Sequence, residues 1–131
     1  MAKQTVLVVD DDIDLVEIIR VTLEKEGYEV LDAQSGERGL ALAREHAPDL
    51  ILLDVMMGQV DEGFQVAYAL RQSDATKRIP IVMLTAVGDR TGFSFDPAKD
   101  ADFLPVDSYL EKPIGPRQLI DEVRRHLPAR I

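Results

Sequence analysis

Short apolar runs recur along this chain, and each stops abruptly at a polar or charged residue. The most apolar of them are residues 5–9, 50–53 and 81–84, which are rich in Val, Ile and Leu. A strand that is apolar on both faces belongs inside a parallel sheet, because only there are both of its faces covered. This pattern therefore predicts a sheet with helices packed on both sides.

Helical patterns fill the intervals between these strands. Gly27 is placed to cap the end of a first helix, Ser35 can cap the start of a second, and Pro116 stands at the first position of the last. The apolar residues that recur at helical spacing are Leu15, Ile19 and Leu23; Leu40, Ala43 and Ala47; Phe64, Ala67 and Leu70; and Leu119, Ile120, Val123 and Leu127.

Two weaker strand patterns, residues 28–33 and 108–111, complete an alternation of strands and helices. This alternation predicts an α/β fold with a doubly wound five-stranded parallel sheet. The stretch 87–107 departs from it, because Gly and Pro residues leave no helical period longer than a turn or two. We therefore expect the fourth helix to be irregular or shortened.

Polar side chains stand at the predicted carboxyl ends of four strands. Asp10 and Asp11 follow the first strand, Asp54 ends the third, Thr85 ends the fourth and Lys112 follows the fifth. Ligands of doubly wound sheets bind beyond the carboxyl ends of the strands, so these side chains should meet. Clustered carboxylates repel one another, and a hard cation such as Mg²⁺ relieves that repulsion. The sequence thus predicts a magnesium site beside a hydroxyl and an ammonium group.

The acidic run at residues 10–12 allows other interpretations. Taken alone, it favours a solvated acidic turn, and we assign Asp12 to the N-cap of the following helix. A calcium-binding EF-hand loop is excluded, because Leu15 and Val21 stand where that loop needs Gly and Glu. A small magnesium-dependent phosphatase of the haloacid dehalogenase type, with Asp10 as its nucleophile, stays open as an alternative, although Asp14 departs from its motif.

Composition narrows the choice of partners. The chain of 131 residues has no cysteine and a formal net charge of −9, so we expect neither nucleic acid nor a membrane as a direct partner. It lacks a long apolar run, and we expect a cytoplasmic protein. His46 and His126 lack the spacing of metal ligands and are interpreted as surface residues.

Four segments together resemble the receiver domain of bacterial two-component response regulators. They are residues 8–12 (VVDDD), 48–57 (PDLILLDVMM), 81–86 (IVMLTA) and 109–113 (YLEKP). The resemblance spans nearly the whole chain and implies a flavodoxin-like strand order of 2-1-3-4-5. We expect one stand-alone receiver over residues 1–131, with a core of about 4–128 and no output domain, similar to the chemotaxis regulators.

The resemblance also implies a role for each strand-end residue. Asp54 would accept a phosphoryl group from a sensor histidine kinase or phosphotransfer protein, and Thr85 and Lys112 would bind its oxygens. Tyr109 would act with Thr85 as the switch, and the Lys112–Pro113 peptide bond would be cis. The ligands implied for Mg²⁺ (or Mn²⁺) are Asp10, Asp11, Asp54 and the backbone carbonyl of Met56.

Such a protein is a signalling switch that takes part in its own phosphorylation and dephosphorylation rather than an enzyme. It would signal by binding another protein. The sequence leaves open both the identity of that target and the oligomeric state of the chain itself. A module of the same fold that is never phosphorylated is a further alternative. Two departures from the family pattern stand out: Gly58 replaces a Pro in the loop after Asp54, which is one residue longer, and the 87–107 stretch is longer than usual.

Overall fold

The computed structural model describes residues 3–54, 62–86 and 106–127, and five parallel strands form its sheet. The strand order is β2-β1-β3-β4-β5, which confirms the flavodoxin-like order. The strands are β1 (Thr5–Val9), β2 (Glu29–Ala33), β3 (Leu50–Asp54), β4 (Ile81–Ala86) and β5 (Ser108–Lys112).

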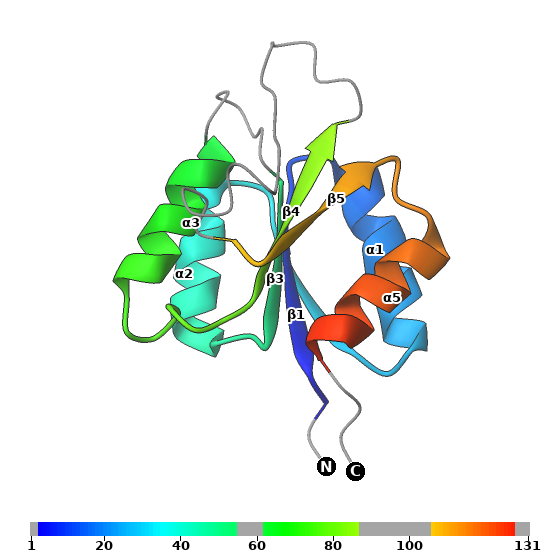
Figure 1. Cartoon of the computed structure of the whole chain (residues 1–131), viewed down its shortest axis with the longest axis horizontal. Coiled ribbons are helices and arrows are strands. Elements are labelled where there is room, and N and C mark those ends of the chain that lie inside the picture. The colour runs from blue at the N-terminus through cyan, green and yellow to red at the C-terminus, as the bar shows by residue number, and fades with distance from the viewer. Residues whose placement is uncertain (1–2, 55–61, 87–105, 128–131) are drawn as a thin grey trace.

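Helices cover both faces of this sheet (Figure 1). The described helices are α1 (Ile13–Lys25), α2 (Gly36–His46), α3 (Glu62–Gln72) and α5 (Pro116–His126). Helices α1 and α5 lie on one face and α2 and α3 on the other, so the doubly wound α/β architecture is confirmed. The prediction of an irregular fourth helix falls within residues 87–105, which lie outside the described residues. None of the described helices has the length and apolarity that a membrane span requires.

The helix ends follow the local signals in the sequence. Asp12 caps α1 by accepting a hydrogen bond from the Leu15 N–H, and Ser35 caps α2 in the same way. Gly27 has a φ of +93°, a left-handed conformation that ends α1 and that residues with a Cβ adopt at a cost. Pro116 stands in the first turn of α5.

Three details differ from the sequence-based expectation. Strand β2 begins after Tyr28, because the Tyr28 N–H still donates to Leu23 O in the turn that closes α1. The assignment of Ala47 to the apolar face of α2 is wrong. Ala47 is the C-cap, with a φ of 45° that turns it into solvent, and Leu42 is buried instead. Strand β5 runs on to Lys112, which pairs with Ala86.

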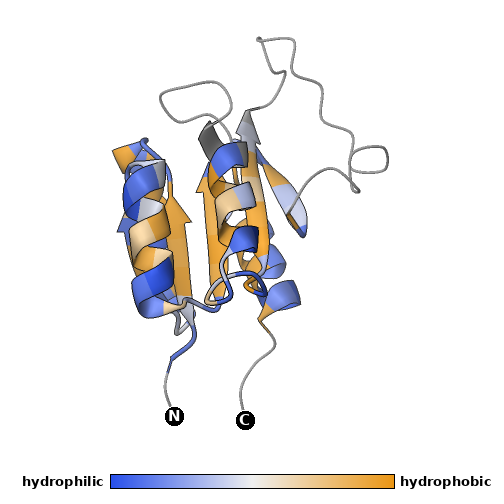
Figure 2. Cartoon of the chain, turned by 90° about the vertical axis from the view of Figure 1, so that its left-hand side faces the viewer, coloured by the Kyte–Doolittle hydropathy of each residue, from blue (hydrophilic) through white to orange (hydrophobic). Residues whose placement is uncertain are grey.

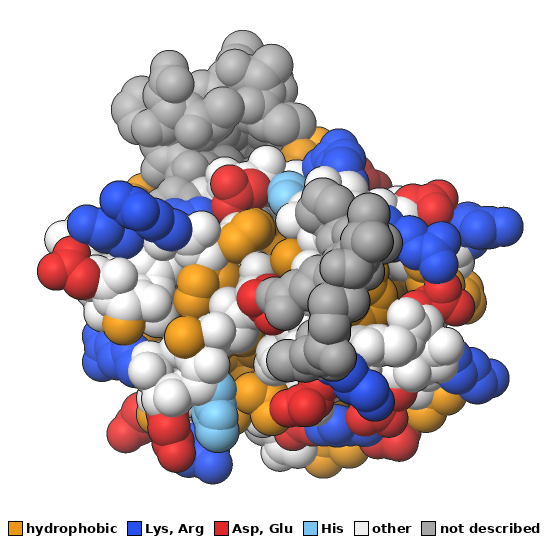
Figure 3. Space-filling model, turned by 90° about the horizontal axis from the view of Figure 1, so that it is seen from below, with side chains coloured by type: hydrophobic (Ala, Val, Ile, Leu, Met, Phe, Trp, Pro, Cys, Tyr) orange, Lys and Arg blue, Asp and Glu red, His pale blue; other side chains and the backbone are white. Residues whose placement is uncertain are grey.

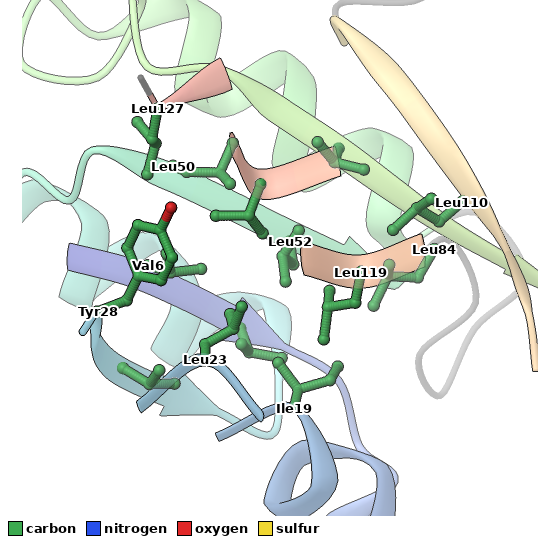
Figure 4. Packing of buried hydrophobic residues seen from close by; sticks show 14 of the residues in the cluster. Val6, Ile19, Leu23, Tyr28, Leu50, Leu52, Leu84, Leu110, Leu119 and Leu127 are labelled. Atoms are coloured by element: carbon green, nitrogen blue, oxygen red, sulfur yellow. The ribbon is translucent and has the colours of Figure 1, made fainter. Parts of the chain in front are cut away.

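Alternate residues of the strands contribute to two apolar cores, one on each side of the sheet. Figure 2 shows largely hydrophobic strands beside helices of mixed hydropathy. Val6, Val8, Leu50 and Leu52 pack under α1 and α5, and Leu119, Val123 and Leu127 belong to the same core. Figure 4 labels Val6, Leu50, Leu52, Leu119 and Leu127 among the residues of this core. The residues that alternate with these in β1 and β3 pack under α2 and α3; they are Leu7, Val9, Ile51 and Leu53. In a fully buried strand such as β3, packing on both sides of the sheet fixes the pairing register. It also fixes the side of the sheet to which each side chain points.

The two edges of the sheet differ in character. The amino edge, where the described chain begins and ends, carries acidic and basic side chains interspersed around apolar ones (Figure 3). The carboxyl edge gathers the residues that the sequence singles out.

Candidate functional site

The sheet register brings the predicted strand-end residues to one edge. Val9 of β1 pairs with Leu53 of β3. Asp10 directly follows Val9 and Asp54 directly follows Leu53, so the two aspartates are neighbours across the strands. Asp54 pairs with Leu84 on β4, and Ala86 pairs with Lys112 on β5. The last positions of four strands thus lie side by side at the carboxyl edge.

The alternation of side chains decides which of these residues face one another. Leu52 and Leu110 both point toward α1 and α5. Asp54 stands two residues after Leu52, and Lys112 stands two residues after Leu110. Asp10 follows Val8 in the same way. These three polar residues therefore continue one side of the sheet beyond its apolar core.

Lys112 joins the two acidic strand ends. Its Nζ lies 2.9 Å from Oδ2 of Asp10 and 3.4 Å from Oδ1 of Asp54. Strands β3 and β4 separate β1 from β5 in the sheet, so the long lysine side chain extends across the edge to reach Asp10. The Lys112–Pro113 peptide bond from which it turns is cis, as the family resemblance implies.

Burial makes this contact energetically significant. Asp10 is fully buried and Asp54 is 5% exposed, so neither charge is well solvated. Burial alone lowers the pKa of Lys112, but the hydrogen bond to Asp10 and the charges of Asp54 and Asp10 together outweigh it. The net effect raises the pKa of Lys112 above its ordinary value of 10.5. Lys112 is therefore a firmly held cation at neutral pH.

Asp10 is fixed from several directions. Its Oδ1 accepts a hydrogen bond from the Asp12 N–H at 2.9 Å, and its own N–H donates to Ala33 O at 3.0 Å. Its Oδ2 is buried, and its partner among the described residues is the Lys112 ammonium at 2.9 Å. One lone-pair direction of this oxygen therefore remains for a further positive group.

Three carboxylates offer a binding site for a cation. One oxygen each from Asp10, Asp11 and Asp54 lies within 4.8 Å of the others. Asp11 is exposed whereas the other two are buried, so the group is open to solvent on one side. Oxygen ligands of this kind suit Mg²⁺, which keeps several of its waters. Met56, the fourth predicted ligand, lies outside the described residues.

Thr85 and Tyr109 lie on the opposite side of the sheet edge from the charged group. Tyr109 packs against the core under α2 and α3, and Met83, two residues before Thr85, belongs to the same core. The Thr85 hydroxyl is 3.5 Å from Leu110 O, at the limit of a hydrogen bond. Its hydroxyl is therefore weakly held.

Some polar contacts carry no signal in the sequence. The interpretation of His126 as a surface residue is wrong, because its side chain is 15% exposed and contacts Ser108 and Glu122. The interpretation of His46 as a surface residue is confirmed. A second network links Arg71 of α3 to Asp107 before β5. Neither network has a periodic pattern that could have revealed it.

Comparison with known families identifies the architecture. A family model described as the response regulator receiver domain matches residues 6–124. The chain belongs to this family. Its members are receivers of two-component signalling.

Individual relatives agree with this assignment. The phosphate regulon transcriptional regulatory protein PhoB of Pseudomonas aeruginosa is 36% identical over 95% of this chain and 52% of its own length. The alkaline phosphatase synthesis transcriptional regulatory protein PhoP of Bacillus subtilis is 39% identical over 93% of this chain and 48% of its own. The chain spans about half the length of the curated relatives it matches.

A solved structure shows the same fold at full length. The chemotaxis response regulator CheY4 of Vibrio cholerae superimposes with a TM-score of 0.82 at 33% identity. The match covers 96% of this chain and all of CheY4.

Proposed function

We propose that this receiver accepts a phosphoryl group on Asp54 and signals its phosphorylated state by binding another protein. The observation that carries the proposal is the placement of Lys112, which contacts both Asp10 and Asp54 at an edge where three carboxylate oxygens converge. An arrangement with one cation and room for another suits a group that gains negative charge.

The transfer itself asks little covalent chemistry of the protein. An Asp54 carboxylate oxygen forms a bond to phosphorus while the bond from phosphorus to the leaving group breaks, and the electron pair departs with that group. The leaving group is neutral imidazole when the donor is the phosphohistidine of a sensor histidine kinase or phosphotransfer protein with its second ring nitrogen protonated. Lys112 neutralises phosphoryl oxygens, and the Thr85 hydroxyl donates a hydrogen bond to one of them.

Asp10, Asp11 and Asp54 would hold Mg²⁺ or Mn²⁺, together with the backbone carbonyl of Met56. The bound ion supplies positive charge to the transferring phosphoryl oxygens. The convergence of the three carboxylates within 4.8 Å and the open lone pair of Asp10 fit this assignment. Asp10 and Asp11 would then orient the ion rather than react.

The switch would follow from the movement of Thr85 toward the phosphoryl group. Tyr109 lies on the same side of the sheet and would fill the space that Thr85 leaves. The weak 3.5 Å hydrogen bond of Thr85 costs little to break, which favours such a movement. A change at Tyr109 alters the surface around β5, where a protein target would bind.

The phosphatase alternative is less compatible with the geometry. A nucleophile needs a free oxygen that substrate can approach, but Asp10 is fully buried, with one oxygen bonded to the Asp12 N–H and the other against Lys112. Asp54 is 5% exposed and ends a strand beside the open side of the site. Asp54 is therefore the better acceptor.

Incubation with acetyl phosphate and Mg²⁺, followed by intact mass measurement, tests the proposal. We expect the wild-type protein to gain one phosphoryl group and Asp54→Asn to gain none. Asp74→Asn, which changes an aspartate whose side chain is 96% exposed, is the matched control and should behave as the wild type. Labelling that survives in Asp54→Asn, or steady phosphomonoester turnover in that variant, would favour the Asp10 phosphatase instead.

A further inference from the structure

A polar cluster holds the beginning of β5 against α5, at the end of the strand far from Lys112. The Ser108 hydroxyl donates to Oε2 of Glu122 at 2.6 Å and lies 3.1 Å from Nε2 of His126. Nε2 of His126 is 3.0 Å from the same Glu122 oxygen, and Arg125 donates to it at 2.6 Å. We call the contacts of Ser108 with Glu122 and His126 the Ser108 clasp.

The clasp is shielded from solvent. The side chain of Glu122 is 13% exposed and that of His126 is 15% exposed. Hydrogen bonds to a partly buried carboxylate are among the stronger ones in proteins, since water competes poorly for the same atoms. The clasp therefore fixes Ser108 to the last turn of α5.

Ser108 and Lys112 belong to one row of side chains. Ser108, Leu110 and Lys112 are alternate residues of β5, so they point to the same face. The first contacts α5, the second packs in the core with Leu119 and Val123, and the third reaches Asp10 and Asp54. The row joins the last turn of α5 to the charged site.

Strand β5 needs such an anchor because it is an edge strand. It pairs only with β4 among the described strands, and each of its faces carries a single apolar side chain, Leu110 or Tyr109. A slip by one residue would turn Lys112 to the opposite face, and few apolar contacts oppose it. Asp107, which pairs with Ile81 and Arg71, holds the strand to β4 and α3 but not to α5.

Strand β5 and helix α5 are connected in sequence by the turn after Lys112. The Ser108 clasp connects them again, at the first residue of β5 and the end of α5. Lys112 lies at the other end of β5, where the chain turns into α5. We propose that the Ser108 clasp positions Lys112 over Asp10 and Asp54, and that the charged site and the last turn of α5 are thereby coupled energetically. Coupling of this kind is reciprocal, so phosphorylation at Asp54 also changes how tightly the clasp holds.

A double-mutant cycle between Ser108 and Lys112 tests the coupling without any ligand. The two residues are four positions apart, about 13 Å along a strand, and effects at such separations normally add. We expect Ser108→Ala to lower the folding equilibrium constant about fivefold in the wild-type background, as loss of one hydrogen bond does. In a Lys112→Met background the same change should lower it less than twofold. Additive effects in urea unfolding would overturn the inference.

Binding of beryllofluoride with Mg²⁺, a phosphoryl mimic, gives a second measurement, which rests on the proposed function. We expect Ser108→Ala to weaken binding about fivefold, a typical coupling. Ser108→Thr, which keeps the hydroxyl, should bind within twofold of the wild type. Thr76→Val, which removes a buried hydroxyl bonded to Leu70 O, is the control and should also leave binding unchanged.

The outcomes separate the two proposals. A wild-type protein that fails to bind beryllofluoride contradicts the proposed function, and the unfolding cycle then decides the inference alone. Wild-type binding that Ser108→Ala leaves unchanged overturns the inference and leaves the proposed function intact. Equal weakening by Ser108→Ala and Thr76→Val would assign the effect to general destabilisation and would also overturn it.

Discussion

The ammonium of Lys112 and the carboxylate of Asp10 form an ion pair of 2.9 Å across strands that are not neighbours in the sheet. Asp54, on a strand between them, completes the group at 3.4 Å from the same nitrogen. One ammonium thus contacts both buried carboxylates of the described site and neutralises part of their charge. The charge of Lys112 should be visible in the stability of the fold as well as in phosphorylation.

The first prediction concerns alkaline pH. The pKa of Lys112 is raised in the folded protein, so its charge contributes stability that is fully present below about pH 10.5 and is lost as pH rises through the folded pKa. Lys112→Met should lower the free energy of unfolding at neutral pH by about 1–3 kcal/mol, because two buried carboxylates lose their cation. The difference from the wild type should shrink above about pH 10.5.

Urea unfolding of both proteins across that pH range measures the effect. Lys77→Met is the control, because Lys77 forms an exposed pair with Asp74 and should change stability by less than about 0.5 kcal/mol. A difference between wild type and Lys112→Met that persists unchanged at strongly alkaline pH would show that the Lys112 charge does not stabilise the fold.

The second prediction concerns Mg²⁺. The ion should bind the folded protein and raise its free energy of unfolding in proportion to the logarithm of its concentration above the dissociation constant. Asp11→Asn should weaken Mg²⁺ binding by about tenfold or more, because Asp11 is the exposed member of the three carboxylates. Isothermal titration calorimetry measures the affinity. Asp14→Asn, an exposed neighbour, should bind nearly as well as the wild type, and equal losses in both variants would indicate unspecific attraction.

The third prediction separates the resting state from the phosphorylated state. Thr85→Val should change the free energy of unfolding by less than about 0.5 kcal/mol, because the contact of its hydroxyl within the described part of the chain is the weak 3.5 Å one with Leu110 O. The same variant should bind beryllofluoride about tenfold more weakly, through loss of one hydrogen bond to a charged group. Thr85→Ser, which keeps the hydroxyl, is the matched variant. Unchanged binding by Thr85→Val would remove Thr85 from the site.

The strand ends were predictable because the physical rule behind them is local. Apolar runs set β1, β3 and β4, and parallel strands bring their carboxyl ends together, so Asp10, Asp54 and Lys112 could be expected at one edge. Which side of the sheet each side chain points to depends on the alternation along the whole strand. Only the packing of the two cores determines that orientation. The ion pair between Lys112 and Asp10 was therefore beyond sequence reasoning.

Contacts between polar residues far apart in sequence were harder to predict. His126 and Glu122 look like solvent-facing residues of an amphipathic helix, yet Ser108 on β5 draws both into a half-buried cluster. Ala47 fits the helical period of α2, but the left-handed turn at the helix end moves it off the apolar face. Tertiary contacts and a single backbone dihedral override the periodic pattern at these positions.

The last prediction concerns Gly39, where α2 lies close against β1. A Cβ at this position would come within 2.8 and 2.9 Å of the two methyl carbons of Val9, the residue immediately before Asp10. Gly39→Ala should therefore destabilise the protein by about 1–3 kcal/mol, although Ala is favoured over Gly inside a helix by about 0.5–1 kcal/mol. Thermal or urea unfolding of the variant measures the net change.

The cause of that destabilisation can be isolated with a second substitution. In a Val9→Ala background the methyl groups are gone, and the nearest atom that remains is the Cβ at 3.4 Å. Gly39→Ala should then stabilise the protein by up to about 1 kcal/mol, because only the helix preference is left. Gly115→Ala has open space around its Cβ and should cost less than about 1 kcal/mol, through poorer capping of α5 alone. If Gly39→Ala destabilises both backgrounds equally, the clash with the Val9 methyl groups is not the cause of the destabilisation.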